Sequence, residues 1–321
     1  MIEHIKLWLR LFRVWSLTAT FSPIWLAACF NADRAANPQT RAVFIQNLLL
    51  AWAACGCLQI ACNLLNLWGD YQSGVDRKDA HCGVPDLVEG RVSPNTVLCV
   101  AVGVVVAALV PAAVLLVRCF SWPLLAIAAL GLFGTLNYCT GLRFKYRGWG
   151  PFCVFFLMGY LLLFAADCCL GGRLTFWMRC WPFWTFPILY GLPVSCLVAN
   201  IMHANDMRDI EKDAAAGITT PATRLGRNGA LALFFVLHLL PYLESVMMVW
   251  MGAYRLSFWC PLLLPFTALA LWRAVRARNG VPARDWAPLL GETARIHLLQ
   301  GLLQGLSMLF AIAMRPGGNF G

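Results

Sequence analysis

The sequence predicts an all-α membrane protein, because its composition, its apolar windows and the absence of a long polar stretch all fit a bundle of transmembrane helices. Of the 321 residues, 60% are hydrophobic and only 12% are charged, well outside the usual balance of soluble domains. Apolar windows of roughly 20 residues, the length that crosses a bilayer core, recur along the chain. We therefore expect a single transmembrane domain over residues 1–321.

Each apolar window is expected to form one membrane-spanning helix, which gives a nine-helix bundle. The first window is too long for a removable signal peptide and lacks the small-residue cleavage site. Short segments rich in charge, glycine or proline separate the windows. In chain order the expected spans are 16–31, 43–66, 96–117, 120–140, 150–170, 182–204, 230–252, 257–272 and 296–313.

The distribution of lysine and arginine predicts the orientation. With a cytoplasmic N-terminus, the N-terminal arm and the connections after spans two, four, six and eight hold 18 of the 25 cations. The positive-inside rule then predicts a cytoplasmic N-terminus and an outside C-terminus. The expected location is a bacterial cytoplasmic (inner) membrane. The net charge of +10 could indicate nucleic acid, but these cations flank membrane segments. We expect the lipid bilayer as a partner and no nucleic acid.

The 14 cysteines lie mostly within the apolar windows and form no CxxC pair. We interpret them as small buried hydrophobic residues. A disulfide on the outer side, near Cys168 or Cys180, is left open.

The acids are concentrated in two connections, both on the expected cytoplasmic side. The segments "NLWGDYQSGVDRKD" (66–79) and "NDMRDIEKDAAAG" (205–217) share the pattern Asn-x-x-x-Asp. Of the 15 acids, the connection after the second span holds Asp70, Asp76, Asp79, Asp86 and Glu89, and the connection after the sixth holds Asp206, Asp209, Glu211 and Asp213.

The spacing of these residues indicates a cation site. Asn205, Asp209 and Asp213 stand at i, i+4 and i+8, so a continuing helix places them on one face, where like charges repel unless a cation binds. The stripe from Gln59 to Asp70 follows one helix face in the same way. Carboxylate and amide oxygens suit Mg²⁺ held together with substrate phosphates. The alternative is that both clusters are solvated loop acids balanced by Arg77, Lys78, Arg208 and Lys212.

The two acidic segments, set within nine expected helices, resemble the UbiA superfamily of intramembrane aromatic prenyltransferases. Four further segments are similar to its quinone branch, the 1,4-dihydroxy-2-naphthoate prenyltransferases of menaquinone synthesis. They are "WLRLFRVWSLTATFSP" (8–23), "NYCTGLRFKYRGWG" (137–150), "RDIEKDAAAGITTPATRLG" (208–226) and "ETARIHLLQGLLQGLSML" (292–309). Two positions depart from the family pattern: Leu67 stands where an acid is expected, and Val14 follows Arg13 where proline is common.

The resemblance implies a Mg²⁺-dependent enzyme that transfers a polyprenyl group from polyprenyl diphosphate to an aromatic acceptor. The expected acceptor is 1,4-dihydroxy-2-naphthoate, which would lose its carboxyl group as CO₂ and give demethylmenaquinone. Another naphthalene, phenolic or tetrapyrrole acceptor remains an alternative. The implied metal ligands are Asp70, Asp76, Asp206, Asp209 and Asp213, of which Asp70, Asp76, Asp209 and Asp213 are also the implied catalytic residues.

The resemblance also implies residues that bind the substrates. Asn66 and Asn205 are expected near the diphosphate. Lys145, Arg147 and Arg224 are candidate diphosphate partners that could equally anchor the chain at lipid headgroups. Tyr138 is expected near the acceptor, with a membrane-interface aromatic residue as the alternative. The 14 Trp, 7 Tyr and 20 Phe can line an apolar tunnel that shields a carbocation, but most of these rings are expected to face lipid or to pack against other residues.

A non-enzymatic transporter is the alternative from a different functional class. It would rest on His238 and Glu244, two ionisable residues inside the seventh expected span, around Pro241. Transporters commonly place their sites near the midplane, whereas the acids here cluster at helix ends. The enzyme is therefore the favoured interpretation, and a kinked, internally paired seventh span is the favoured explanation of His238 and Glu244.

Overall fold

The protein is described here by a computed structural model covering residues 2–76, 84–171, 185–251, 253, 257–277 and 286–314. Within these ranges the regular structure is helical, apart from an isolated β-bridge between Arg147 and Thr219. The all-α prediction is confirmed. Asp79 and Cys180 lie outside the described residues, and Cys168 is a buried free thiol.

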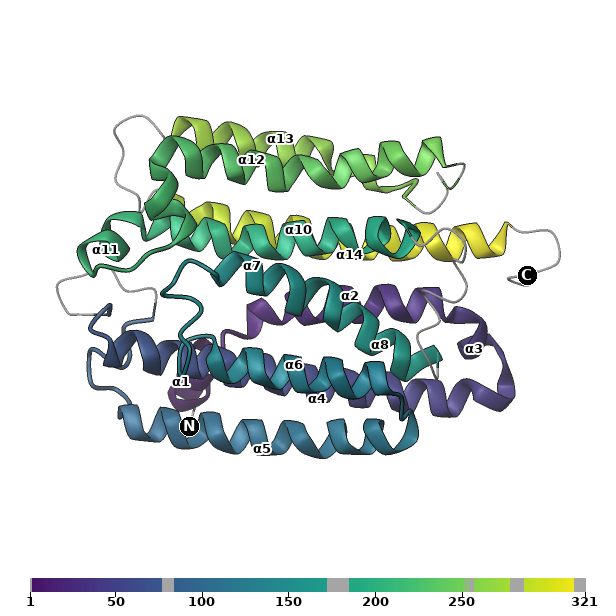
Figure 1. The fold of residues 1–321 in the computed structure, drawn as a ribbon, viewed down its shortest axis with the longest axis horizontal. Coiled ribbons are helices and arrows are strands. Elements are labelled where there is room, and N and C mark those ends of the chain that lie inside the picture. The colour runs from purple at the N-terminus through teal and green to yellow at the C-terminus, as the bar shows by residue number, and fades with distance from the viewer. Residues whose placement is uncertain are drawn as a thin grey trace.

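The long helices run alongside one another, with α12 and α13 at one edge of the view and α5 at the other (Figure 1). In chain order the helices are α1 (Ile2–Leu11), η1 (Val14–Leu17), α2 (Thr18–Phe30), α3 (Ala32–Ala36), α4 (Pro38–Gln72), α5 (Pro94–Arg118), α6 (Trp122–Asn137), α7 (Gly150–Val154), η2 (Phe155–Leu161), α8 (Leu162–Gly171), α10 (Thr185–Arg208), α11 (Ile210–Ala215), α12 (Pro221–Trp250), η4 (Cys260–Leu263), α13 (Leu264–Arg276) and α14 (Ala287–Ala313).

Six helical segments of the described chain are long and apolar enough to cross a membrane. They are α4, α5, the continuous run 150–171, α10, α12 and α14. The windows expected at 16–31, 120–140 and 257–272 form the shorter helices α2, α6 and α13, of 13, 16 and 13 residues. A 13-residue helix is only about 20 Å long, so by helix length six spans are supported in the described residues and the nine-span prediction is not confirmed.

The outer faces of the long helices are apolar, as a lipid-facing surface requires. On α5, Val102, Val106 and Val110 are each more than half exposed. Exposed valine side chains are unfavourable in water, whereas they are well accommodated by the hydrocarbon core of a bilayer. The protein is an integral membrane protein.

Four of the helices begin with a capping residue followed by proline within the first two positions. Asn37, Ser93, Ser121 and Thr220 each accept a hydrogen bond from a backbone N–H of the first turn of α4, α5, α6 and α12, respectively. The cap satisfies an N–H group that the helix leaves free, and proline fits there because it has no N–H to lose. These sequence signals therefore fix where the helices start.

Two glycines let helices from the two halves of the chain approach closely. A Cβ at Gly159 of η2 would clash with Ser195 on α10, and a Cβ at Gly305 of α14 would clash with Trp25 on α2. Small residues at such crossings permit tight backbone packing within a membrane. The contacts bring α10, which carries the second acidic segment, against the half of the bundle that carries the first.

Both acidic segments lie at one end of the bundle, where α4, α6 and α10 end and α5 and α12 begin (Figure 1). We call it the acid end. Gly74 and Gly217, each with φ near +70°, close the turns after α4 and α11 in a conformation that favours glycine. The expected continuous helix through the second segment is instead broken at Asp209, between α10 and α11.

Candidate functional site

A cavity of about 690 Å³ opens between the two halves of the bundle. Its lining includes both Ala51 and Asp70 of α4, which lie about 28 Å apart along the helix axis. Most of its wall is aliphatic and comes from α5, α6, η2, α8 and their neighbours, whereas its acid end is polar. The polar residues at that end are Asn66, Asp70, Asp76, Lys145, Asn205, Arg208, Asp209, Lys212 and Asp213.

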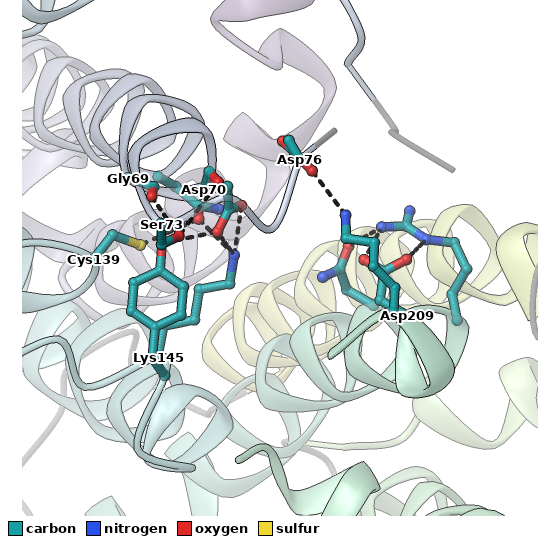
Figure 2. A network of polar contacts seen from close by, with 12 residues as sticks. Gly69, Asp70, Ser73, Asp76, Cys139, Lys145 and Asp209 are labelled. Carbon is teal, nitrogen blue, oxygen red and sulfur yellow. Dashed lines mark hydrogen bonds and ion pairs between the residues drawn. The ribbon is translucent and has the colours of Figure 1, made fainter. Parts of the chain in front are cut away.

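Asp70 is held by groups from the loop after α6 (Figure 2). The Lys145 Nζ donates to both Asp70 oxygens at 2.7 Å and to Asn66 Oδ1 at 2.7 Å. The Tyr146 hydroxyl donates to Asp70 Oδ1 at 2.8 Å. Burial opposes the charge on Lys145, but its contacts with Asp70 outweigh that effect and raise the Lys145 pKa. Lys145 is therefore a firmly charged cation in the cavity wall.

The loop from 138 to 149 reaches α4 because Gly69 leaves room for it. A Cβ at Gly69 would stand 3.0 Å from the Tyr146 hydroxyl and 3.2 Å from Cys139 Cβ. The Cys139 Sγ donates to Asn66 Oδ1 at 3.1 Å, which adds a second contact from the same loop. The Asn66 carbonyl oxygen thus receives two donors, and the first acidic segment is set by tertiary contacts.

The second acidic segment is held mainly by its own neighbours. Arg208 Nε and one terminal nitrogen donate to the two oxygens of Asp209 at 2.7 and 2.6 Å, and the same nitrogen donates to Asn205 Oδ1 at 2.7 Å. Burial raises the Asp209 pKa, but the hydrogen bonds and charge of Arg208 outweigh it, so the net shift is downward. This two-point pairing keeps Asp209 ionised.

One ion pair links the two segments. The Lys212 Nζ on α11 donates to Asp76 Oδ1, beyond the end of α4, at 2.8 Å. Figure 2 shows Asp76 between the group around Asp70 and the group around Asp209. The contact crosses the acid end of the cavity, so the two segments face one shared space.

Two carboxylates of the second segment differ from Asp209. Asp206 and Asp213 are 2% and 7% exposed, and neither has an ion pair or a side-chain hydrogen bond within the described residues. Burial is the main cause that raises the pKa of Asp213, to about 7. Asp213 lines the cavity, whereas Asp206 lies behind its wall. A buried carboxylate without a partner is costly, so Asp213 offers an oxygen pair to an incoming cation.

The wall next to Asp70 carries further polar groups. Gln59 and Asn63 of α4 line the cavity, and their amide nitrogens donate to backbone oxygens of Ser16 and Phe12. Arg13 lines it too, with a positive φ of 51°. The Tyr138 hydroxyl is buried and has no partner in the described part of the chain. These groups could contact a polar ligand beside the acid end.

The structure separates the predicted site residues into two groups. Arg147 and Arg224 are exposed and contribute nothing to the cavity wall, while Asp206 lies just behind it. The predicted residues that line the cavity are Asn66, Asp70, Asp76, Tyr138, Lys145, Asn205, Asp209 and Asp213.

Sequence reasoning did not assign site roles to four neighbours of these residues. Arg13, Tyr146, Arg208 and Lys212 all line the cavity or bond an acid there. Arg208 and Lys212 stand within the acidic motif itself and were interpreted only as balancing charge. Adjacency to Lys145 was the available signal for Tyr146, but only the folded loop shows which acid it reaches.

Aromatic residues contribute little to the cavity wall, so the structure does not support an aromatic tunnel lining. Of the described residues that line the cavity, only Trp15 and Tyr138 are aromatic. Aromatic rings instead pack on one another elsewhere, as in the contacts of Phe155 with Tyr160 and of Phe258 with Phe310. Small side chains make a narrow space between helices wide enough for an extended apolar chain, and alanines from α5, α6 and α8 supply them here.

Two other residues singled out by sequence have structural roles. Leu67 is 1% exposed in a hydrophobic cluster with Leu11 and Leu64, so it faces neither lipid nor the cavity. Asp86 is 1% exposed and pairs with Arg10 and Arg91 at 3.2 Å each. Neither lines the cavity.

His238 and Glu244 are buried in α12, outside the cavity wall. The His238 ring shares a 2.5 Å hydrogen bond with Asn200 of α10, and the Ser245 hydroxyl donates to Glu244 at 3.3 Å. Their position within the packed bundle fits an internally paired helix, as the sequence interpretation favoured.

The donor set at the acid end fits a hard cation. Carboxylates and carboxamides from both segments face one cavity, and these are ligands that Mg²⁺ accepts together with substrate phosphates. In the described residues no three acidic, histidine or cysteine side chains converge closely enough to hold a metal by themselves. The cavity therefore offers oxygen ligands from two walls, with lysine and arginine among them to balance a polyanion.

Comparison with known proteins gives consistent results. The model of the UbiA prenyltransferase family matches residues 20–299. UbiA prenyltransferase domain-containing protein 1 from Gallus gallus is 30% identical over 316 residues, covering 95% of this chain and 84% of the relative. The Homo sapiens protein of the same name is 29% identical over 318 residues, covering 96% and 83%.

Solved structures share the fold. A UbiA homolog from Archaeoglobus fulgidus bound to GPP and Mg²⁺ superposes with a TM-score of 0.63 at 17% identity, covering 93% of this chain and 99% of the other. The apo structure of a UbiA homolog from Aeropyrum pernix K1 gives 0.58 at 20% identity, covering 91% and 98%.

The helical bundle with its acid-tipped apolar cavity is that of an integral membrane enzyme. The chain belongs to the UbiA prenyltransferase family.

Proposed function

We propose that the protein transfers a polyprenyl group from polyprenyl diphosphate to an aromatic acceptor, with Mg²⁺ as cofactor. The observation that carries this proposal is the cavity that joins a polar end, lined by acids and cations, to an aliphatic tunnel, over a total length of about 28 Å along α4. An isoprene unit spans about 5 Å, since it adds four carbon–carbon bonds of about 1.5 Å in a zigzag. The whole cavity is therefore as long as about five units, and the prenyl chain that fits beyond the acid end is shorter than that.

The acid end suits the diphosphate. Asp70, Asp76, Asp209 and Asp213, with Asn66 and Asn205, would hold Mg²⁺, and Asp206, which does not line the cavity, remains a proposed ligand only from the resemblance. When bound, Mg²⁺ would neutralise charge on the departing diphosphate. Lys145 offers a positioned ammonium for the same purpose, already oriented by Asp70 and Asn66. Arg147 and Arg224 remain proposed diphosphate partners only from the resemblance, because both are exposed.

The prenyl chain would lie in the aliphatic tunnel. Alanine and leucine side chains from α5, α6 and α8 exclude water from the carbon that develops positive charge, and no lining nucleophile is needed. The acceptor ring would lie beside Tyr138, where the unpartnered hydroxyl can donate a hydrogen bond.

We propose 1,4-dihydroxy-2-naphthoate as the acceptor, with loss of CO₂ and formation of demethylmenaquinone. Arg13 in the cavity wall supports an acceptor that carries a carboxylate, because a guanidinium pairs well with that group. Gln59 and Asn63 can bond ring hydroxyls. Another naphthalene, phenolic or tetrapyrrole acceptor is the alternative.

The test uses purified protein in lipid nanodiscs with labelled geranylgeranyl diphosphate and a panel of aromatic acceptors. We expect a prenylated product, identified by mass, and diphosphate release that EDTA abolishes and Mg²⁺ restores. With 1,4-dihydroxy-2-naphthoate the product mass should also show loss of CO₂. Transfer to a different acceptor alone would overturn the naphthoate proposal, and diphosphate release with no prenylated product from any acceptor would overturn the prenyl transfer itself.

We also propose that the acid end faces the cytoplasm of a bacterial inner membrane, with the N-terminus inside. Reporter fusions should place residues 76 and 213 inside and residue 321 outside. A reporter at residue 76 active only on the outer side would reverse this orientation.

A further inference from the structure

The Asp76–Lys212 ion pair differs from the other ion pairs of the cavity. Lys145 donates hydrogen bonds to both Asp70 and Asn66, and Arg208 donates to Asp209 from two nitrogens. Lys212 has one side-chain bond in the described residues, to Asp76 Oδ1 at 2.8 Å. Its ammonium sits on a flexible four-carbon stem, so it can change partner at little cost in geometry.

The position of the pair creates a competition. Both side chains line the cavity, and only 16% of the Lys212 side chain and 8% of the Asp76 side chain are exposed. Asp76 belongs to the oxygen set proposed to hold Mg²⁺, yet the Lys212 ammonium already occupies one of its oxygens. A cation that binds Asp76 must displace that ammonium, and a displaced ammonium in a largely buried space needs a new anion. The diphosphate would supply one.

We propose that Lys212 exchanges partners during substrate binding. In the ligand-free protein its ammonium neutralises Asp76 and ties the two acidic segments together. When the metal and the diphosphate enter, the ammonium leaves Asp76 and donates to a diphosphate oxygen, which frees the Asp76 carboxylate for the metal. This exchange rests on the proposed function and makes Lys212 a substrate-binding residue that also lowers metal affinity in the absence of substrate.

The exchange predicts opposite effects of one substitution on two ligands. In Lys212→Met, Asp76 has no competitor, so Mn²⁺ should bind the substrate-free protein about tenfold more tightly, as expected for loss of one charged hydrogen bond. At saturating Mg²⁺, the unreactive analogue geranylgeranyl thiodiphosphate should bind about tenfold more weakly. Lys212→Arg should keep both affinities near wild type.

The experiment measures both affinities by titration of the full-length protein in nanodiscs. Arg227→Met is the matched control: it removes one cation that pairs with Glu211 of α11, outside the cavity wall, and should leave both affinities unchanged. Asp76→Asn tests the other partner and should weaken Mn²⁺ binding while retaining Lys212 for the analogue. Thermal unfolding of each variant checks that it is folded.

The outcomes separate the two proposals. If wild type binds both ligands, and Lys212→Met weakens both or changes neither, Lys212 has a structural role and the exchange is wrong. Wild-type protein that binds neither Mn²⁺ nor the analogue would overturn the proposed function together with the exchange. Tighter metal binding combined with weaker analogue binding supports the exchange specifically.

Discussion

The two acidic segments have similar residues but are stabilised in different ways. Asp70 is fixed by Lys145 and Tyr146, which come from a loop 75 and 76 residues later in the chain. Asp209 is fixed by the adjacent Arg208. The first segment therefore depends on tertiary structure, whereas the second is assembled within one helical turn. The same Asn-x-x-x-Asp pattern can thus be held rigidly by distant or by neighbouring residues.

The second acidic segment also contains a carboxylate that is not paired with a cation in the described residues. Asp70 and Asp209 each have a cation, whereas Asp213 has no ion pair within the described residues. The first segment has Leu67 in a hydrophobic cluster where the family pattern places an acid. We infer that the first segment mainly positions cations and the second supplies the free charge that attracts the metal.

The largest expected effect comes from neutralising the two paired acids. Asp70→Asn and Asp209→Asn should each lower the transfer rate by about 100-fold to 1000-fold, because each removes a carboxylate proposed to hold the Mg²⁺ that neutralises the departing diphosphate. Asp70→Asn should in addition destabilise the protein by about 3 kcal/mol, since it leaves Lys145 buried without its anion. Asp209→Asn should destabilise the protein less, because Arg208 still donates a hydrogen bond to Asn205.

Turnover and thermal unfolding of both variants test this difference. Equal losses of stability would show that the two segments are held alike and would remove the contrast between distant and local pairing. Retention of wild-type turnover by Asp209→Asn would assign that residue a purely structural role.

The next effect uses the position where the two segments differ. Leu67→Asp buries a carboxylate among Leu11, Leu64 and their neighbours, without a partner. We expect a loss of about 3 kcal/mol in stability and no decrease in the Mg²⁺ concentration needed for half-maximal rate. Leu67→Met is the control, since it keeps an apolar side chain of similar volume. A lower Mg²⁺ requirement in Leu67→Asp would instead show that this position reaches the metal.

The sequence predicted what depends on local signals. Helix starts follow from capping residues with proline, such as Ser93, and the apolar windows indicated the long helices. The acids at Asp70 and Asp209 indicated one end of the bundle. The apolar windows at 16–31 and 120–140 also suggested full spans, but α2 and α6 have only 13 and 16 residues, because an apolar window does not set where a helix starts or stops.

The partners of the acids could not be predicted in the same way. Arg208 is adjacent to Asp209, so its pairing was accessible from sequence. The Lys145–Asp70 and Lys212–Asp76 pairs join residues 75 and 136 positions apart and depend on how the loops fold. Arg147 shows the converse error: it stands two residues from Lys145 yet points its charge to the exposed surface.

A smaller effect is expected at Asp213, with a pH dependence. Burial raises the Asp213 pKa to about 7, above the unfolded value near 3.8, so the folded protein holds a proton that the unfolded chain loses. Wild-type stability should therefore fall as pH rises from about 4 to 7 and stay level above 7. Asp213→Asn removes this loss.

In metal-free buffer Asp213→Asn should be more stable than wild type by about 2 kcal/mol at pH 8, with a smaller difference at pH 5. Thermal unfolding in EDTA at the two pH values measures it. The same variant should bind Mn²⁺ more weakly, so the substitution should raise stability while it lowers metal affinity. A variant less stable than wild type at pH 8 would mean that the carboxylate already has a partner.

The smallest expected effect separates the cavity wall from the exposed arginines. Arg147 lies in the loop after α6, which a β-bridge to Thr219 joins to the segment before α12, and Arg224 lies near the start of α12, but both side chains are exposed outside the cavity wall. An exposed cation contributes roughly 0–1 kcal/mol to an ion pair, and salt screens it further. We therefore expect Arg147→Gln and Arg224→Gln to change the affinity for geranylgeranyl thiodiphosphate by less than about twofold. Lys145→Gln removes a buried cation bonded to Asp70 and should weaken the binding of this analogue by about tenfold or more. The comparison is made at 50 and 300 mM salt. The contrary result is an arginine variant that weakens binding as much as Lys145→Gln at both salt concentrations. That result would mean that the arginine side chain moves into the cavity when the diphosphate binds, so that a cation from outside the cavity wall also takes part in binding.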